Sequence, residues 1–227
     1  MDTGFGETST AGPRNIGKYA EMTKGKFITF EGSEGCGKST QSKLLYDYLK
    51  KKGYSVISLR EPGATKISEK IRKILLDCKN DSMSEEAEML LYMAARAQIV
   101  EELIKPAISA GKIVICDRFL DSTLAYQGYG LGIDIGLIKK VGGFVTQGIR
   151  PDLTIFLDLP VKKGLKHREY CEDRIEMRSL SYHDKVRRGY LKLASFEPAR
   201  IKVVRVEKEK KDTQSKIRNL TDKLLSK

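Results

Sequence analysis

The sequence lacks three features that would place the chain in a membrane or in a disulfide-bonded secreted class. No stretch approaches the roughly 20 apolar residues of a membrane-spanning helix. Residues 1–21 carry no apolar core of the signal-peptide kind. The cysteines are scattered, without a C-x-x-C pair, at Cys36, Cys78, Cys116 and Cys171. We therefore expect reduced thiols in a cytoplasmic protein, with neither a disulfide frame nor a structural zinc site.

The chain has fewer acidic than basic residues. The chain has 30 Asp and Glu residues against 42 Lys and Arg residues, which gives a net charge of +12. This excess indicates an anionic partner, either nucleic acid or a pair of nucleotides. From residue 207 onward, seven basic and four acidic residues at helical spacing are typical of a solvated helix face. Because basic patches with interleaved aromatic residues are missing, we expect nucleotides as partners, and neither nucleic acid nor a membrane.

The apolar runs predict one three-layer α/β domain. A chain of 227 residues fits a single large domain, which we place at 25–227, after a disordered extension at 1–24. Helical patterns alternate with short, nearly unbroken apolar runs of the kind found in strands buried on both faces of a parallel sheet. The five predicted strands are 27–30, 55–59, 113–116, 153–159 and 201–206.

The clearest helical pattern lies at 84–110. Ser84 followed by two glutamates is typical of a helix start, and Gly111 is typical of a helix end. Pro106 predicts a kink or a break near the end of this helix, because proline lacks the backbone N–H that a helix interior needs.

One stretch matches the phosphate-binding pattern G-x-x-x-x-G-K-[S/T] in full. It lies between the predicted strand at 27–30 and a helical pattern, so backbone N–H groups and the positive end of a helix dipole are directed at one small volume. Lys38 is expected to reach the β- and γ-phosphates there, and the Ser39 hydroxyl to ligate Mg²⁺. The residues expected to bind ATP are Gly32, Ser33, Glu34, Gly35, Cys36, Gly37, Lys38, Ser39 and Thr40.

Charged residues follow three of the predicted strands, at 31–32, 60–63 and 117–118. Ligands of open α/β sheets gather beyond the carboxyl ends of the strands. Motor and helicase ATPases usually carry an acidic pair at the third of these places, whereas here Asp117 is followed by a cation, Arg118. The N-K-x-D signature of small GTPases is missing as well. This pattern favours a phosphotransferase that acts on an anionic acceptor.

The stretches that carry a family resemblance are Phe30-Glu31-Gly32 with the phosphate-binding stretch, Arg60-Glu61-Pro62-Gly63, 94–98, Asp117-Arg118-Phe119, 122–128, Pro151-Asp152-Leu153 and 173–176. Taken together, they resemble the bacterial thymidylate kinases, which are P-loop nucleoside monophosphate kinases. The resemblance runs from Lys26 to about Arg200. It implies a five-stranded parallel sheet wrapped by helices, a homodimer, Mg²⁺ as cofactor and the reaction ATP + dTMP → ADP + dTDP.

The resemblance assigns catalytic roles to the residues after the first and third strands. Direct phosphoryl transfer needs in-line placement and neutralisation of charge rather than a covalent intermediate. Lys38, Arg118 and a Mg²⁺ ion held by Ser39 would supply this. Asp117 would hold the metal through water or orient Arg118, and the alternative for Arg118 is a structural salt bridge with Asp117.

The resemblance also places the acceptor nucleotide. Arg60 would grip the dTMP phosphate next to Pro62, where the family uses a rigid turn that can be cis. Glu34 would accept a hydrogen bond from the 3′-hydroxyl. Tyr92 and Arg96 are four residues apart and therefore share a helix face; the first would stack on thymine and the second would hydrogen-bond its O4. The remaining contacts would come from Arg118, from Thr123 at the base edge, from Tyr126 beside the sugar C2′ and from Gln127 at the pocket floor.

A short lid over ATP is implied at about 161–173. Relatives with glycine at the position of Gly35 supply a catalytic arginine from this lid. Arg168 is therefore the expected transition-state arginine and Arg174 the second candidate; the alternative is that each is a solvated charge.

Other hypotheses stay open from the sequence alone. One is another nucleoside monophosphate kinase with dUMP or dGMP as acceptor. A second, from a different class, is a nucleic-acid-dependent ATPase or a basic binding module. A third is an inactive scaffold, against which the intact Lys38, Ser39, Asp117 and Arg118 argue.

Overall fold

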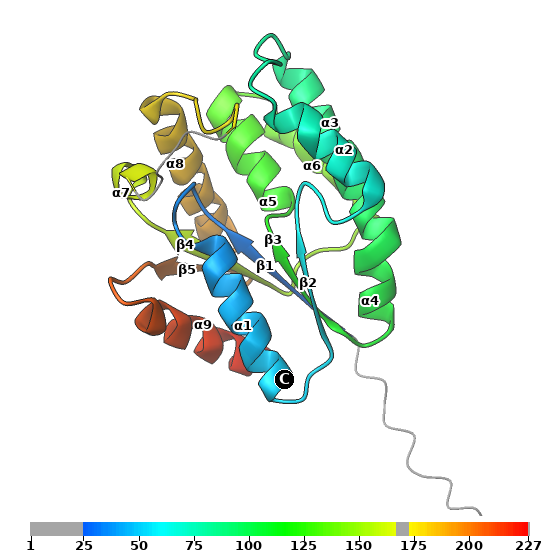
Figure 1. Cartoon of the computed structure of the whole chain (residues 1–227), viewed down its shortest axis with the longest axis vertical. Helices are drawn as coiled ribbons and strands as arrows, with labels where there is room; N and C mark the ends of the chain where they lie inside the picture. The colour runs from blue at the N-terminus through cyan, green and yellow to red at the C-terminus, as the bar shows by residue number, and fades with distance from the viewer. Residues whose placement is uncertain (1–24, 167–172, 227) are drawn as a thin grey trace, which may run out of the picture.

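The computed structural model describes residues 25–166 and 173–226. The extension expected at 1–24 lies outside these residues. Within them, the predicted five-stranded parallel sheet is confirmed, with the strand order β2-β3-β1-β4-β5 (Figure 1). The strands are β1 Lys26–Glu31, β2 Val56–Arg60, β3 Ile113–Asp117, β4 Leu153–Asp158 and β5 Ile201–Arg205.

Helices cover both faces of the sheet, as the alternation of patterns predicts (Figure 1). Ile28 of β1 shares an apolar cluster with Leu45 of α1 and Ile217 of α9 on one face. The neighbouring residue Phe27 shares a cluster with Ile99 on the other face, because successive strand residues point to opposite sides. The helices are α1 Lys38–Lys51, α2 Lys66–Leu76, α3 Glu85–Ile99, η1 Val100–Ile104, α4 Lys105–Ser109, α5 Leu120–Thr123, η2 Leu124–Leu131, α6 Ile135–Val145, α7 Val161–Lys166, α8 Leu180–Phe196 and α9 Lys210–Leu225.

The helix expected at 84–110 begins where the sequence predicts but is made of three pieces. Ser84 caps α3 by accepting a hydrogen bond from the Ala87 N–H at 3.2 Å. The π-helical segment η1 then follows directly, and α4 continues the chain to Ser109 with Pro106 in its first turn. The chain therefore stays helical through Pro106, and the irregularity is the π-helical stretch that directly precedes α4.

The register of the sheet sets the position of the site. Phe30 of β1 pairs with Asp117 of β3, and Arg60 of β2 pairs with the same residue. The carboxyl ends of the three strands are therefore level, so the side chains that follow them meet at one edge of the sheet. Among the described residues, no helix is long and apolar enough to cross a membrane.

Candidate active site

The loop between β1 and α1 has the geometry of an anion cradle. Gly37 precedes the first helical residue with φ at +90°, in the left-handed region. Gly32 has φ at +147°, and a Cβ atom there would lie 2.7 Å from the Leu157 carbonyl oxygen. A side chain would strain or block these positions, so each of them needs glycine. The strand, the glycine loop and the helix follow one another as the motif predicts.

The two polar residues that open α1 are held by specific partners. The Lys38 ammonium group donates to the backbone oxygens of Gly32 at 3.1 Å and Ser33 at 3.0 Å, so its charge is kept over the loop. The Ser39 hydroxyl donates to Asp117 Oδ2 at 2.7 Å. The other carboxylate oxygen, Asp117 Oδ1, is buried and has no hydrogen-bond partner among residues 25–166 and 173–226. A hydroxyl beside an unsatisfied carboxylate oxygen is a set of hard oxygen ligands.

Arg118 lies at the centre of the site. Its guanidinium group makes an ion pair with Glu34 and donates to the Tyr126 hydroxyl at 3.0 Å and to the Gly32 oxygen at 3.2 Å. Tyr126 in turn donates to Glu34 at 2.7 Å. Burial by itself would lower the pKa of Arg118, but the Glu34 carboxylate and the surrounding oxygen groups raise it well above its ordinary value. Arg118 is therefore a fixed cation between the phosphate loop and the rest of the cavity.

A second pair of arginines lies across the cavity from the loop. Arg60 and Arg72 both donate to the backbone oxygen of Pro62, at 3.4 Å and 3.0 Å. Burial lowers the pKa of Arg72, and the nearby positive charge of Arg60 lowers it further. Glu69 pairs with Arg60 at 3.0 Å. Two guanidinium groups at one carbonyl favour an anion beside them.

The peptide bond between Glu61 and Pro62 is cis, the isomer that the resemblance raised. The Glu61 side chain is buried, at 4% exposed. Burial raises the pKa of Glu61 to about 7, although Arg96 opposes the shift.

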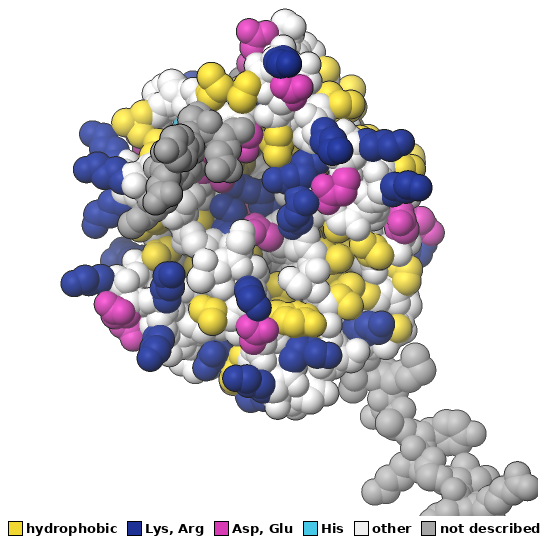
Figure 2. Space-filling view, viewed as in Figure 1, with side chains coloured by type: hydrophobic (Ala, Val, Ile, Leu, Met, Phe, Trp, Pro, Cys, Tyr) yellow, Lys and Arg dark blue, Asp and Glu magenta, His cyan; other side chains and the backbone are white. Residues whose placement is uncertain are grey.

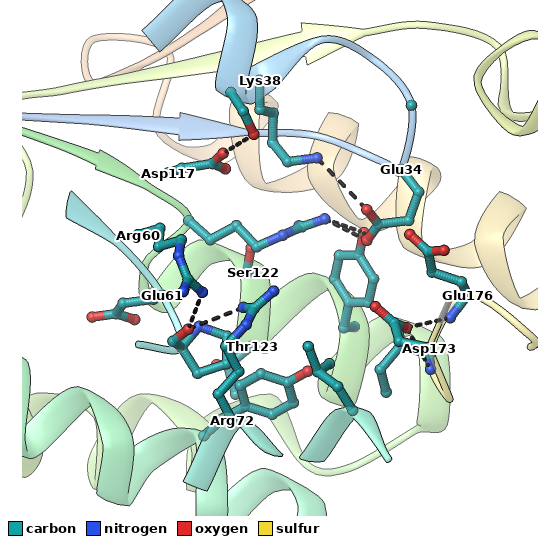
Figure 3. A pocket seen from close by; sticks show the side chains of 18 of the residues that line it. Glu34, Lys38, Arg60, Glu61, Arg72, Asp117, Ser122, Thr123, Asp173 and Glu176 are labelled. Carbon is teal, nitrogen blue, oxygen red and sulfur yellow. Dashed lines mark hydrogen bonds and ion pairs between the residues drawn. The ribbon is translucent and has the colours of Figure 1, made fainter. Parts of the chain in front are cut away.

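One cavity of about 410 Å³ joins these groups. The space-filling view shows it as a hollow with Lys and Arg side chains in its depth (Figure 2). Lys38 and Asp117 lie at one end of it and Arg72 at the other (Figure 3). The predicted residues that line it are Glu34, Gly35, Gly37, Lys38, Ser39, Thr40, Arg60, Pro62, Tyr92, Asp117, Arg118, Thr123, Tyr126 and Gln127.

Sequence and structure comparisons identify the family of this chain. The family model described as thymidylate kinase matches residues 30–217. A thymidylate kinase of Thermoanaerobacter sp. (strain X514) is 53% identical over 78% of this chain and 87% of its own length. One of Geotalea daltonii is 52% identical over 79% of this chain and 88% of its own length. The chain belongs to the thymidylate kinase family.

A solved thymidylate kinase structure shares the fold. The crystal structure of the enzyme from Ehrlichia chaffeensis superimposes with a TM-score of 0.73 at 34% identity, and the match covers 87% of this chain and 98% of that one. The resemblance inferred from the motifs is therefore confirmed, and the three-layer fold with it.

In this member of the thymidylate kinase family, Arg96 lies behind the cavity wall. It is 2% exposed and is not among the residues that line the cavity. It donates to Glu61 at 2.8 Å, to Thr123 Oγ1 at 2.9 Å and to the Phe119 oxygen at 2.9 Å. These bonds fix Thr123, so Arg96 supports the wall on which a base would rest; its direct contact with a base stays a prediction.

The structure describes only one of the two arginines expected in the lid. Arg168 lies outside the described residues. Arg174 is buried, and its guanidinium group contacts Glu88 at 2.6 Å and the Leu75 oxygen at 3.1 Å. Because it does not line the cavity, its placement favours a structural ion pair over the transition-state role expected as the second candidate.

Position 35 of this chain has no room for a side chain. A Cβ atom there would lie 2.0 Å from the backbone oxygen of Gly164 in α7, and a Cβ on Gly164 would lie 2.4 Å from the Glu34 oxygen. The backbones of the phosphate loop and α7 thus touch. No side chain, and hence no catalytic arginine, fits at position 35 in this arrangement.

Sequence reasoning missed several residues of the site. Arg72 lines the cavity, and its only signal was its place two turns after Thr65, which caps α2. Glu88 resembles one more acid in the first turn of α3, yet it is fully buried. Glu31, quoted only as part of a motif, accepts hydrogen bonds from the Phe119 N–H and the Ser122 hydroxyl.

Proposed function

We propose that this chain transfers the γ-phosphoryl group of ATP to dTMP and forms dTDP. The observation that carries the proposal is one cavity, lined by described residues, with a group of cationic side chains at each end. One end is the phosphate loop with Lys38, and the other is the pair of Arg60 and Arg72. A kinase that joins two phosphate groups needs this arrangement, because both nucleotides are anions and must meet end to end.

The transferring phosphoryl group would lie near Arg118. This buried cation lies between the loop and the acceptor end and is held by its bonds to Gly32 and Tyr126. Charge develops on the oxygens of the transferring group, and a preorganised cation stabilises it without reorganisation during the reaction. In the described structure Glu34 neutralises this cation, so a bound phosphate would compete with Glu34 for it.

The residues present also fit a Mg²⁺ ion. Ser39 and Asp117 would hold it, the latter directly or through water, and the buried Asp117 Oδ1 that lacks a partner is the observation that supports this. The ion would neutralise charge on the β- and γ-phosphates. The protein groups beside it, Lys38 and Arg118, would orient the same phosphates.

The acceptor would lie between the arginine pair and the polar wall. Arg60 and Arg72 would bind the dTMP phosphate, and Tyr92, which lines the cavity, would stack on the base. Thr123 and Gln127 would face its polar edge. Tyr126 would stand beside the sugar and exclude a 2′-hydroxyl.

A homodimer is part of the proposal. Phe144 of α6 is 84% exposed, and Leu90 of α3 and Leu137 of α6 are about half exposed. Since α3 and α6 pack together, these apolar side chains favour a second copy of the chain as their cover. Sedimentation equilibrium would test this, and a monomer at all concentrations would contradict it.

A coupled assay tests the reaction. With ATP and Mg²⁺, we expect dTMP to be the fastest acceptor among dTMP, dUMP, dGMP and CMP. Loss of the thymine methyl group should cost dUMP about 10- to 200-fold in kcat/KM, the range that a methyl-sized group supplies in an apolar pocket. Faster turnover of any other acceptor would overturn the assignment. Hydrolysis of ATP that DNA stimulates without an acceptor would favour a nucleic-acid-dependent ATPase.

The same assay tests the phosphate loop through Lys38→Ala. We expect this variant to lose transfer while it keeps the thermal midpoint of the parent, because Lys38 contacts only loop groups. Lys43→Ala on the same helix is the matched control, since the Lys43 side chain is 76% exposed. Undiminished turnover of Lys38→Ala would refute the role of this lysine.

A further inference from the structure

Glu88 is a fully buried carboxylate that links three parts of the chain. Its Oε1 atom accepts a hydrogen bond from the Gln127 amide nitrogen at 2.8 Å. Its Oε2 atom accepts bonds from Arg174 at 2.6 Å and Arg178 at 2.7 Å. Glu88 itself is 0% exposed and does not line the cavity, whereas Gln127 does. A buried charge with this set of partners fixes the geometry of each of them.

The carboxylate decides which way the Gln127 amide turns. An ionised carboxylate accepts hydrogen bonds and donates none, so the amide must present its nitrogen to Glu88. The other polar atom, Gln127 Oε1, receives no hydrogen bond from the described residues. This oxygen is not fully buried and Gln127 lines the cavity, so we infer that the oxygen faces the cavity. The site therefore offers an acceptor at Gln127.

Thr123 complements this acceptor. Arg96 donates a hydrogen bond to the Thr123 Oγ1 atom at 2.9 Å, and no residue in the described part of the chain accepts a bond from the Thr123 hydroxyl, so its hydrogen can be donated to a ligand. Thr123 ends α5, and Gln127 lies four residues later in η2, so both side chains belong to one short stretch of the cavity wall. The wall thus offers a donor and an acceptor together.

Resting on the proposed function, we propose that Glu88 is a positioning residue that sets the base specificity of the acceptor site. By holding the Gln127 amide, it selects a pyrimidine whose ring N–H lies beside a carbonyl group, as in thymine and uracil. Cytosine presents the reverse pattern, a bare ring nitrogen beside an amino group. With cytosine, the bare ring nitrogen would lie opposite Gln127 Oε1, so two hydrogen-bond acceptors would face each other. An unmatched polar group in a closed site costs binding free energy.

Glu88→Gln tests this assignment. Its single side-chain oxygen would be taken by Arg174 and Arg178, so its amide nitrogen would face Gln127 and turn that amide around. The cavity would then present a donor. We expect the ratio of kcat/KM for dTMP to that for dCMP to fall by about tenfold or more, with dCMP gaining in absolute terms. Glu85→Gln, an exposed glutamate on the same helix, should leave the ratio unchanged.

The outcomes separate specificity from stability and from the proposed function. A parallel fall of both substrates, with a lower thermal midpoint, would make Glu88 a structural residue and overturn the inference. A parent enzyme that does not phosphorylate dTMP would overturn the proposed function, and the inference with it. Should Glu88→Gln fail to fold by circular dichroism, Gln127→Met keeps both arginine ion pairs of Glu88 and should also lower the ratio; an unchanged ratio would refute the idea.

Discussion

At the scale of single residues, the site depends on a strained backbone that neighbouring groups hold in place. Arg118 has φ at +73°, in a region that side chains other than glycine seldom adopt. Its N–H donates to the Phe30 oxygen at 2.9 Å, and the next N–H, of Phe119, donates to Glu31 Oε1 at 2.7 Å. Glu31 Oε2 accepts from Ser122 and Tyr190. These bonds fix the direction in which Arg118 leaves the strand.

Glu31 should make stability depend on pH. Burial, with the nearby charge of Asp121, raises the pKa of Glu31 from 4.5 to about 7. Between these two values the folded chain binds a proton that the unfolded chain has released. The contribution of this group to the free energy of unfolding is therefore full below about pH 4.5 and is lost as the pH rises through about 7.

Urea unfolding of the parent and of Glu31→Gln across this window checks the sign. We expect the free energy of unfolding of the parent to fall, relative to the variant, as the pH rises. Glu61, whose pKa is also raised to about 7, is present in both proteins and cancels in the difference. Asp121→Asn should move the fall to lower pH, since Asp121 helps to raise the pKa. A difference that stays constant with pH would contradict the assignment.

At the scale of elements, local patterns predict where helices and strands begin better than how they continue. The five strands and the start of α3 at Ser84 follow from apolar runs and cap chemistry, which are properties of neighbouring residues. The π-helical segment η1 does not follow from local patterns, because Pro106 predicts an irregularity in the helix but not its π-helical form.

The cap of α3 gives a prediction at this scale. Ser84→Ala should lower the free energy of unfolding by about 1 kcal/mol, because the Ala87 N–H loses its partner. Ser84→Gly is the matched control and should lose only a few tenths of a kcal/mol, since glycine caps nearly as well. Urea denaturation measures both. Equal stability of the alanine variant and the parent would show that the cap contributes nothing.

The candidate site also contains residues that local motifs predict and residues that they do not predict. The phosphate loop and the charged residues after β2 and β3 are contiguous motifs, and the sequence predicts all of them. Glu88 acts through partners far along the chain, such as Arg174, which lies 86 residues away, and Arg72 becomes part of the site only where α2 packs beside the Pro62 carbonyl. No local pattern carries that information, because the fold alone brings these residues together. The cytoplasmic location and the lid at 161–173 stay predictions.

At the scale of the whole molecule, the fold concentrates positive charge where two nucleotides would meet. The level ends of β1, β2 and β3 bring the loop, Arg60 and Arg118 to one edge of the sheet. Helix α2 adds Arg72 from the side. The cationic groups at this cavity suit a pair of anionic ligands, and the absence of a nucleic-acid partner stays a prediction.

Calorimetric titration of dTMP into the chain saturated with Mg²⁺ and a non-hydrolysable ATP analogue tests this most directly. We expect dTMP to bind beside the analogue, and Arg72→Ala to weaken dTMP far more than the analogue, because Arg72 lies at the acceptor end. CMP serves as the control acceptor and should bind more weakly. If dTMP gives no binding heat at several temperatures while the analogue is bound, or only displaces the analogue, two nucleotides do not share this cavity.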